Sequence, residues 1–257
     1  MQLVETEIRN GAMWLWLNRP GRHNALVPEL ISNLRTAIVE AAKSAPAALV
    51  LCGRGHSFST GGDVGGFLDH AATREQLIRY ANGLVAGLHD TIMDLLTFPA
   101  PVLAAVNGPV TGGSTGLVLA ADMVAMADTA FVQPYYREVG FGPDGGWTAL
   151  LPDRVGTARS LEVQYLNSRL TPAQAQGLGL VSRICPRSDL EGVIDDWVAS
   201  IRGGMAQTHG VTRSNVWDDA RLALVRARLE QEKEQFLNLI VRTETLEGMK
   251  NFTRKSA

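Results

Sequence analysis

The sequence has few of the features that mark secreted, redox-active or nucleic-acid-binding proteins. It contains two cysteines, Cys52 and Cys185, in apolar stretches and without the Cys-x-x-Cys or Cys/His spacing of a metal or thiol site. A structural disulfide is therefore not expected, and a reducing compartment fits. The 24 Lys and Arg against 26 Asp and Glu give a net charge of -2 with no dense basic run. This argues against a nucleic-acid partner and against a polybasic membrane patch.

Long hydrophobic runs are also missing. The mostly apolar stretches are too short for a membrane span and contain Gly, Pro or Asp. The first ten residues mix charged with apolar side chains and lack the apolar segment of a signal peptide. We therefore expect a soluble, cytoplasmic protein with no membrane partner. The 257 residues, 46% of them hydrophobic, are enough to bury a large core.

The sequence does show an alternation of strand-like and helix-like segments. Asn10-Gly11, the dipeptide preferred in two-residue hairpin turns, separates the first two strand-like segments. Apolar residues recur every three or four positions in the helix-like segments. We expect strands at residues 3–8, 12–17, 47–52, 102–106, 122–127, 130–132 and 180–184. We expect helices at residues 28–41, 77–95, 114–121, 158–166, 172–176, 190–201 and 220–241.

This alternation indicates an α/β fold. After about Gly156 the pattern becomes mainly helical, interrupted by one short strand-like segment. We therefore expect a core over residues 1–195, followed by a helical region over residues 196–257.

Two glycine-rich loops, residues 58–64 and 111–116, each follow an expected buried strand. Glycine lets a ligand approach the main chain closely, with N–H groups pointing outward. The second loop is expected to begin a helix, which adds partial positive charge. Two such donors on one carbonyl oxygen would form an oxyanion hole. For either loop alone, an ordinary tight turn that leads into a helix is the plainer explanation.

The second loop also spells G-x-S-x-G, the nucleophile elbow of serine hydrolases, with Ser114 at its centre. That elbow needs a strand running directly into the Ser, and Pro109 interrupts the approach. His209 follows Ser114 but falls in residues 203–212, which we expect to be a loop. A serine hydrolase is therefore disfavoured. A dinucleotide site is weaker still, because the full G-x-G-x-x-G pattern is absent.

Six short motifs occur in order along nearly the whole chain. They are Leu17-Asn18-Arg19-Pro20 with Asn24-Ala25-Leu26, residues 58–64, residues 101–108, Gly112-Gly113, residues 121–131 and the tail, residues 247–255. In this order they resemble the enoyl-CoA hydratase/isomerase (crotonase) superfamily. The resemblance implies a crotonase-like spiral of ββα units, with a C-terminal helical region that mediates homotrimers or hexamers built from two trimers.

The resemblance also implies a site for an acyl-CoA thioester. The oxyanion donors would be the N–H groups of Gly62 and Gly113. Coenzyme A would enter as part of the substrate, so no separate cofactor and no metal are expected. The residues implied to lie against it are Arg19, Arg22, His23, Ala25, Thr60, Gly61, Asp63, Val64, Phe252 and Lys255. The last two would reach CoA on the same or a neighbouring subunit, while Arg22 and Lys255 are equally explained as solvated charges.

The family's hydratases use two Glu residues, and this sequence lacks both. The first position is Gly116, and the second falls near Tyr135 or Tyr136. What remains is Asp144, in a stretch that resembles the phenylacetate-pathway enoyl-CoA isomerases, where an Asp is the lone acid/base. One carboxylate suffices for a 1,3-proton shift. The plainer explanation is that Asp144 caps a helix starting near Gly145.

His89 and Tyr136 are further catalytic candidates. His89 lies twelve residues before Pro101, where the 4-chlorobenzoyl-CoA dehalogenase branch also has a functional His. That branch uses an Asp at the Asp144 position as nucleophile, and has Trp where Tyr136 falls. Tyr136 could bind substrate or assist proton transfer, although simple packing is its plainer role.

We therefore expect an enoyl-CoA isomerase that uses Asp144 and the Gly62/Gly113 oxyanion hole. The alternatives are a hydratase-like enzyme, and a hydrolase or dehalogenase in which Asp144 is the nucleophile. A further alternative is a protein that binds CoA thioesters without catalysis. RNA binding, known in one branch of the superfamily, is disfavoured by the acidic balance.

Overall fold

The computed structural model describes residues 2–256, with side-chain surroundings up to residue 254. The chain begins with a hairpin of β1 (Val4–Arg9) and β2 (Ala12–Leu17). Asn10 and Gly11 both have positive φ, 52° and 82°, as the two central residues of a type I′ turn require. The expected hairpin is thus confirmed.

Beyond the hairpin, the main sheet is parallel. It adds β3 (Leu49–Gly53), β4 (Val102–Val106), β6 (Met123–Ala127) and β8 (Arg183–Cys185), in the order β1-β2-β3-β4-β6-β8. Every residue of β3 and β4 is buried. Such strands consist of continuous apolar residues because helices cover both faces of a parallel sheet.

A second, short ladder runs beside the main sheet. It contains β5 (Val110–Thr111) and β7 (Val132–Gln133), extended by single bridges. The bridges join Leu26 to Gly62, Ser59 to Val110, and Val132 to Leu170. The chain therefore leaves the main sheet, pairs briefly in the second ladder and returns through a helix. This repeated path is the expected spiral of ββα units, and both glycine-rich loops lie on the second ladder.

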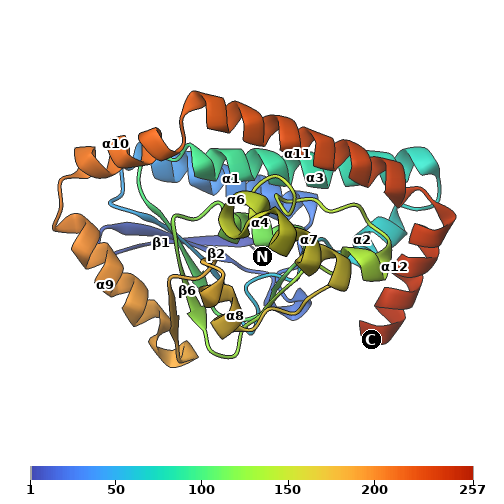
Figure 1. Cartoon of the computed structure of the whole chain (residues 1–257), viewed down its shortest axis with the longest axis horizontal. Coiled ribbons are helices and arrows are strands. Elements are labelled where there is room, and N and C mark those ends of the chain that lie inside the picture. Colours follow the sequence, from blue (N-terminus) through green and yellow to red (C-terminus); the bar gives the residue numbers. More distant parts are fainter. Residues whose placement is uncertain (1, 257) are drawn as a thin grey trace.

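Helices cover both faces of the main sheet (Figure 1). Side chains of β4 alternate between two cores: Val102 and Val106 join the larger one, whereas Leu103 joins the smaller one beneath α9. The helices are α1 (Pro28–Lys43), α2 (Val64–Asp69), α3 (Arg74–Leu96), α4 (Thr115–Leu119), α5 (Tyr136–Val139), α6 (Leu151–Val155), α7 (Thr157–Leu166), α8 (Pro172–Gly177), α9 (Leu190–Arg202), α10 (Ala206–Val216), α11 (Asp219–Ile240) and α12 (Thr243–Ser256), with 3-10 turns η1 (Pro20–Arg22), η2 (Gly112–Ser114) and η3 (Arg187–Asp189).

The C-terminal helices fold back over the core of their own chain. In Figure 1, α11 lies along α3 across the top of the molecule and α12 turns down beside α2. The expected boundary at residue 195 falls inside α9, whose apolar face packs on the sheet. Within residues 2–256, no helix is long and apolar enough to cross a membrane.

Residues 203–212 were expected to form a loop, and this was wrong: they largely belong to α10. The apolar periodicity is weak there because α10 is held mainly by a polar residue, the buried Arg213. Its guanidinium donates to Oδ2 of Asp122 at 2.8 Å and to the backbone carbonyls at the end of α3. Because α10 is anchored by an arginine, its sequence lacks the apolar periodicity by which helices are predicted.

We predict that Arg213→Ala lowers the free energy of unfolding by about 3–5 kcal/mol, because it leaves Asp122 and the α3 carbonyls without their buried partner. Urea denaturation measures this. The control is Arg159→Ala, which breaks the exposed ion pair with Glu162 and should cost less than about 1 kcal/mol. Equal losses would contradict the assignment.

Candidate active site

A cavity of about 760 Å³ opens between the two glycine-rich loops and helices α3, α11 and α12. Most of the predicted site residues line it: Arg22, His23, Ala25, Thr60, Gly61, Gly62, Asp63, Val64, Gly113, Tyr136, Asp144 and Phe252. Arg19 and His89 are not among the described lining residues and lie behind them. The side chain of Lys255 lies outside the described part of the structure.

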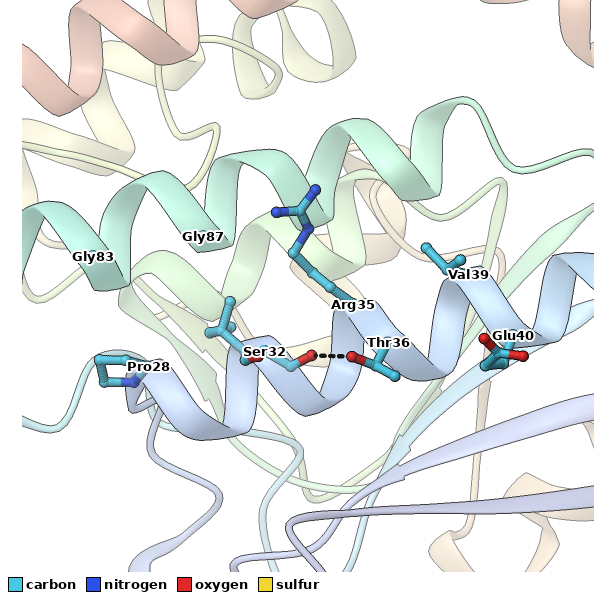
Figure 2. Close-up of a pocket in the computed structure, with 9 residues that line it drawn as sticks. Pro28, Ser32, Arg35, Thr36, Val39, Glu40, Gly83 and Gly87 are labelled. Atoms are coloured by element: carbon cyan, nitrogen blue, oxygen red, sulfur yellow. Dashed lines mark hydrogen bonds between the residues drawn. The ribbon is translucent and has the colours of Figure 1, made fainter.

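A second hollow, of about 410 Å³, lies between α1 and α3 (Figure 2). Arg35 crosses it to reach Asp90 and Asp94 at 3.0 and 2.9 Å. Its described lining includes none of the residues that the sequence predicts for the site. The larger cavity is therefore the candidate active site.

The backbone of Gly62 is oriented by its bridge to Leu26. The Leu26 N–H donates to the Gly61 carbonyl at 2.7 Å, and the Asp63 N–H donates to the Leu26 carbonyl at 2.9 Å. In a parallel bridge of this kind, the N–H of the central residue points to the opposite side. The Gly62 N–H therefore points away from Leu26, on the side where the loop lines the cavity.

Gly113 is the second residue of η2, and the first N–H groups of a helix have no intrahelical acceptor. The two glycine-rich loops touch beside it. A Cβ on Gly61 would lie 2.8 Å from the Thr111 carbonyl oxygen and 3.3 Å from the Cα of Gly112. Gly62 and Gly113 directly follow these contacts and both line the cavity, so their N–H groups can serve one carbonyl oxygen.

Ser114 joins the two loops instead of acting as a nucleophile. Its side chain is fully buried, and its hydroxyl lies 2.8 Å from the Thr111 carbonyl and 3.0 Å from the Ser59 carbonyl. His209 lies on α10, with its Nε2 3.1 Å from the Ile201 carbonyl. The serine-hydrolase alternative therefore has neither an accessible nucleophile nor a base beside it.

Asp144 lies directly against Gly113. A Cβ on Gly113 would be 2.9 Å from its Oδ2 and 3.1 Å from its Oδ1. The plainer explanation of Asp144, a cap on a helix starting near Gly145, does not hold: residues 145–150 form turns, and α6 begins at Leu151. The Asp144 carboxylate therefore caps no helix there. Instead, Oδ1 accepts a hydrogen bond from the Tyr136 hydroxyl at 2.6 Å, which leaves Oδ2 beside Gly113.

The surroundings of Asp144 favour proton transfer near neutral pH. Burial raises the pKa of Asp144 to about 7, the Tyr136 hydrogen bond lowers it, and the charge of Glu232 raises it. Burial and the Asp144 charge raise the pKa of Tyr136 well above its ordinary value, so its hydroxyl keeps its proton. That hydroxyl also lies 2.8 Å from the Asp144 backbone carbonyl. It can thus donate to ionised Oδ1 or, when Asp144 is protonated, to the carbonyl.

His89 holds the turn after Asp144 and does not face the cavity. Its Nε2 accepts a hydrogen bond from the Gly145 N–H at 3.1 Å. Burial and the Lys233 charge lower the pKa of His89 to about 4. The ring is therefore neutral, and the nitrogen that could accept a proton is already occupied.

Glu232 of α11 is a site residue that sequence reasoning missed. Its carboxylate is 3% exposed and accepts hydrogen bonds from Gly146, Thr148 and Ala149, the residues that follow Asp144. A signal existed in the sequence. The buried stripe of α11 is Val225, Leu229, Glu232, Phe236 and Ile240, so a carboxylate stands where the helical spacing requires an apolar residue.

The first carboxylate position of the family's hydratases is filled by backbone here. A Cβ on Gly116 would overlap the Gly145 carbonyl oxygen and lie 2.5 Å from Cδ1 of Ile92. Even a methyl group has no room, because the Asp144 turn occupies that space. The turn that follows Asp144 therefore leaves room only for glycine at position 116.

Asp63 fixes the entrance of the cavity. It caps α2 by accepting from the Gly65 N–H, and it accepts from Arg19 at 2.8 Å and Arg22 at 3.2 Å. Burial alone would raise the pKa of Asp63, but these two arginines hold it below its ordinary value. Arg19 also donates to the Ala25 carbonyl, so it orders the loop. Arg22 is largely exposed at the cavity rim.

The interior of the cavity is apolar and aromatic. Phe67 contacts Phe141 and Phe236 with ring centroids 5.4 and 5.9 Å apart, and all three line the cavity. Phe252 of α12 lines the cavity of its own chain and packs against Tyr135. Among the described residues, no three His, Cys, Asp or Glu side chains gather to hold a metal ion.

The chain is similar to known proteins over most of its length. The sequence model of the family described as enoyl-CoA hydratase/isomerase matches residues 7–257. YhaR from Bacillus subtilis is 27% identical over 236 residues, 91% of each chain. EchA12 from Mycobacterium tuberculosis is 30% identical over 226 residues, 84% of this chain and 77% of its own.

4-Chlorobenzoyl coenzyme A dehalogenase-2 from Arthrobacter sp is 26% identical over 214 residues, 83% of this chain and 77% of its own. The crystal structure of an enoyl-CoA hydratase from Bacillus halodurans has the same fold, with a TM-score of 0.90 at 24% identity, and covers 97% of this chain and 99% of its own.

The chain therefore belongs to the enoyl-CoA hydratase/isomerase family, as its motifs indicate. It has the crotonase fold and is an enzyme of this superfamily that acts on CoA thioesters.

We predict that Gly116→Ala destabilises the protein by about 1–3 kcal/mol, because the added methyl group displaces the Asp144 turn. Urea denaturation measures the loss, and turnover should fall with it. Gly83→Ala is the matched control, because a Cβ on Gly83 of α3 meets open space and alanine favours a helix. A Gly116→Ala protein as stable as the wild type would show that the turn does not fill this space.

We predict that Asp144→Asn stabilises the protein increasingly as the pH rises. The folded pKa, about 7, lies above the ordinary value of 3.8. From about pH 4 to 7 the unfolded chain loses this proton while the folded protein keeps it, so wild-type stability falls. Above pH 7 the penalty is on the order of 4 kcal/mol. Urea denaturation of both proteins at about pH 4 and pH 8 tests this. A pH-independent difference would contradict it.

Proposed function

We propose that the protein is an enoyl-CoA isomerase in which Asp144 carries a proton between two carbons of a thioester enolate. One observation carries this proposal: the buried carboxylate of Asp144, with a pKa raised to about 7 by burial, lies against Gly113, the second proposed oxyanion glycine. A pKa near the working pH suits a group that must both accept and donate the same proton.

In the proposed reaction, the N–H groups of Gly62 and Gly113 bind the thioester carbonyl. Ionised Asp144 takes a proton from a carbon of the acyl chain, and the electron pair of that C–H bond moves to the carbonyl oxygen. The two N–H groups stabilise this enolate by several kcal/mol. The proton then returns to a different carbon, the double bond shifts, and Asp144 is again ionised. No water is consumed.

The hydratase-like alternative is less well supported, because the Asp144 turn fills the first Glu position. The hydrolase or dehalogenase alternative keeps Asp144 as nucleophile but needs a base for water. His89 is a poor candidate, because its Nε2 already accepts from the Gly145 N–H and its lowered pKa makes the ring a weak base. The similarity to an Arthrobacter dehalogenase keeps this the second candidate. A non-catalytic CoA-thioester-binding protein would have no use for the raised pKa of Asp144.

Coenzyme A enters as part of the substrate, no other cofactor takes part, and the enzyme works in the cytoplasm as a homotrimer or hexamer. Exposed apolar side chains on α7, including Tyr165 and Leu166, are of the kind that such an assembly would cover. Phe252 lines its own chain's cavity, which supports a CoA contact within one subunit.

We predict that Asp144→Asn lowers turnover of enoyl-CoA thioesters by about 10²–10⁴-fold, with thioester affinity nearly unchanged. Wild type and variant are incubated in D₂O with 2-enoyl- and 3-enoyl-CoA thioesters, and mass spectrometry follows deuterium uptake and product mass. Wild-type kcat/KM should rise with pH through about 7, as Asp144 ionises.

Each alternative leaves a different trace in this experiment. A product heavier by one water indicates a hydratase, and oxygen from labelled water in a released acid indicates Asp144 as nucleophile. Binding without exchange in the wild type indicates a non-catalytic protein. Full activity in Asp144→Asn would overturn the assignment of the base.

A further inference from the structure

Asp144 is followed by a turn that two helices hold from outside the cavity. On one side, His89 of α3 accepts from the Gly145 N–H. On the other, Glu232 of α11 accepts from the N–H groups of Gly146 at 2.8 Å, Thr148 at 2.6 Å and Ala149 at 2.9 Å. The turn needs such support, because Gly145 and Gly146 both have positive φ and form no regular element.

Glu232 is bound as an anion is bound in a backbone nest. The Thr148 hydroxyl adds a fourth donor at 2.7 Å, so three donors converge on Oε1 and one on Oε2. Burial raises the pKa of Glu232, and these hydrogen bonds oppose that shift because each one stabilises the ionised form. A side chain that only fills space in the core would not need four hydrogen bonds.

The charge of Glu232 has no cation beside it among the described residues. His89 Nε2 is 3.7 Å from Oε2, but this ring is neutral, since it accepts from Gly145. Lys233 forms its own ion pair with Glu230 at 2.7 Å, and Arg228 reaches Asp153 and the Ala149 carbonyl. The remaining titratable group that faces Asp144 is Tyr136, from α5.

We propose that Glu232 is a positioning residue for catalysis: as a buried anion bound by four donors, it holds the Asp144 turn against Gly113. Its negative charge also opposes ionisation of Asp144. This inference rests on the proposed role of Asp144 as the acid/base. Tyr136 acts in the opposite sense, because its hydrogen bond stabilises ionised Asp144. Glu232 therefore favours the protonated form of Asp144 and Tyr136 favours the ionised form, and together they set the pKa of Asp144.

The test measures the pKa of Asp144 directly, by NMR titration of ¹³C-labelled aspartate carboxyls, with the signal assigned from its loss in Asp144→Asn. Glu232→Gln should lower this pKa by about one unit, because it removes a nearby like charge. Tyr136→Phe should raise it. Glu234→Gln is the matched control, with the same substitution on the same helix at an exposed position, and should leave it unchanged.

Kinetics provide the second readout. Glu232→Gln should lower kcat with little change in KM, because Glu232 touches the Asp144 turn and not the entrance. The pH profile of kcat/KM should move to lower pH by the amount measured by NMR. If Glu232→Gln loses folding stability while the Asp144 pKa stays the same, Glu232 has only a structural role and the proposal is overturned.

If Glu232→Gln does not fold, Glu232→Asp provides the test. This variant keeps the negative charge but shortens the side chain by one methylene, which moves the carboxylate away from the turn. A lowered kcat with a still-raised Asp144 pKa supports the proposal, and wild-type kcat overturns it. Failure of the proposed function is distinguishable. A wild type inactive on every thioester refutes the isomerase, whereas unmoved pKa values beside an inactive Asp144→Asn refute only the inference about Glu232.

Discussion

Two stretches of backbone without side chains pack against each other in the site, and the position of Asp144 depends on this contact. A Cβ on Gly145 would lie 2.7 Å from the Cα of Gly113, a distance that only glycine permits. Gly116, three residues after Gly113, faces the same turn at the Gly145 carbonyl. Because side chains are absent on both sides, the chain after Asp144 can rest on the oxyanion loop, and this places a carboxylate beside a main-chain donor.

Two buried carboxylates then divide the work by environment. Glu232 is surrounded by four donors, whereas the Asp144 side chain has Tyr136 as its hydrogen-bond partner. Burial raises the pKa of both carboxyls, and the hydrogen bonds to each oppose that shift. Asp144 has fewer donors than Glu232, and its pKa lies at about 7. In the proposed mechanism, the Glu232 anion supports the turn, and Asp144 takes and returns the proton.

Much of this arrangement is predictable from the sequence because it depends on local backbone preferences. Asn10-Gly11 predicts the hairpin, and the glycine motifs predict Gly62 and Gly113 at the cavity. The resemblance also singles out Asp144 as a site residue. The alternative of a helix cap does not hold, because two glycines with positive φ follow Asp144 and no helix forms there. The strand expected at residues 180–184 begins later, at Arg183.

What the sequence does not reveal are partners far apart along the chain. Glu232 and Gly146 are separated by 86 residues, and no local pattern says which loop a helix will cross. The same holds for Arg213, which meets the end of α3 115 to 118 residues away. A single polar residue on an apolar stripe signals that a buried contact exists, but the contact itself is determined by the tertiary fold.

The path of α11 over the Asp144 turn has a consequence for the order in which the enzyme comes into being. During synthesis the oxyanion loops and Asp144 leave the ribosome well before α11, because translation proceeds from the N-terminus. Until α11 docks, the turn after Asp144 lacks the hydrogen bonds that Glu232 provides. A nascent chain that has not yet reached α11 therefore cannot hold Asp144 as the folded protein does.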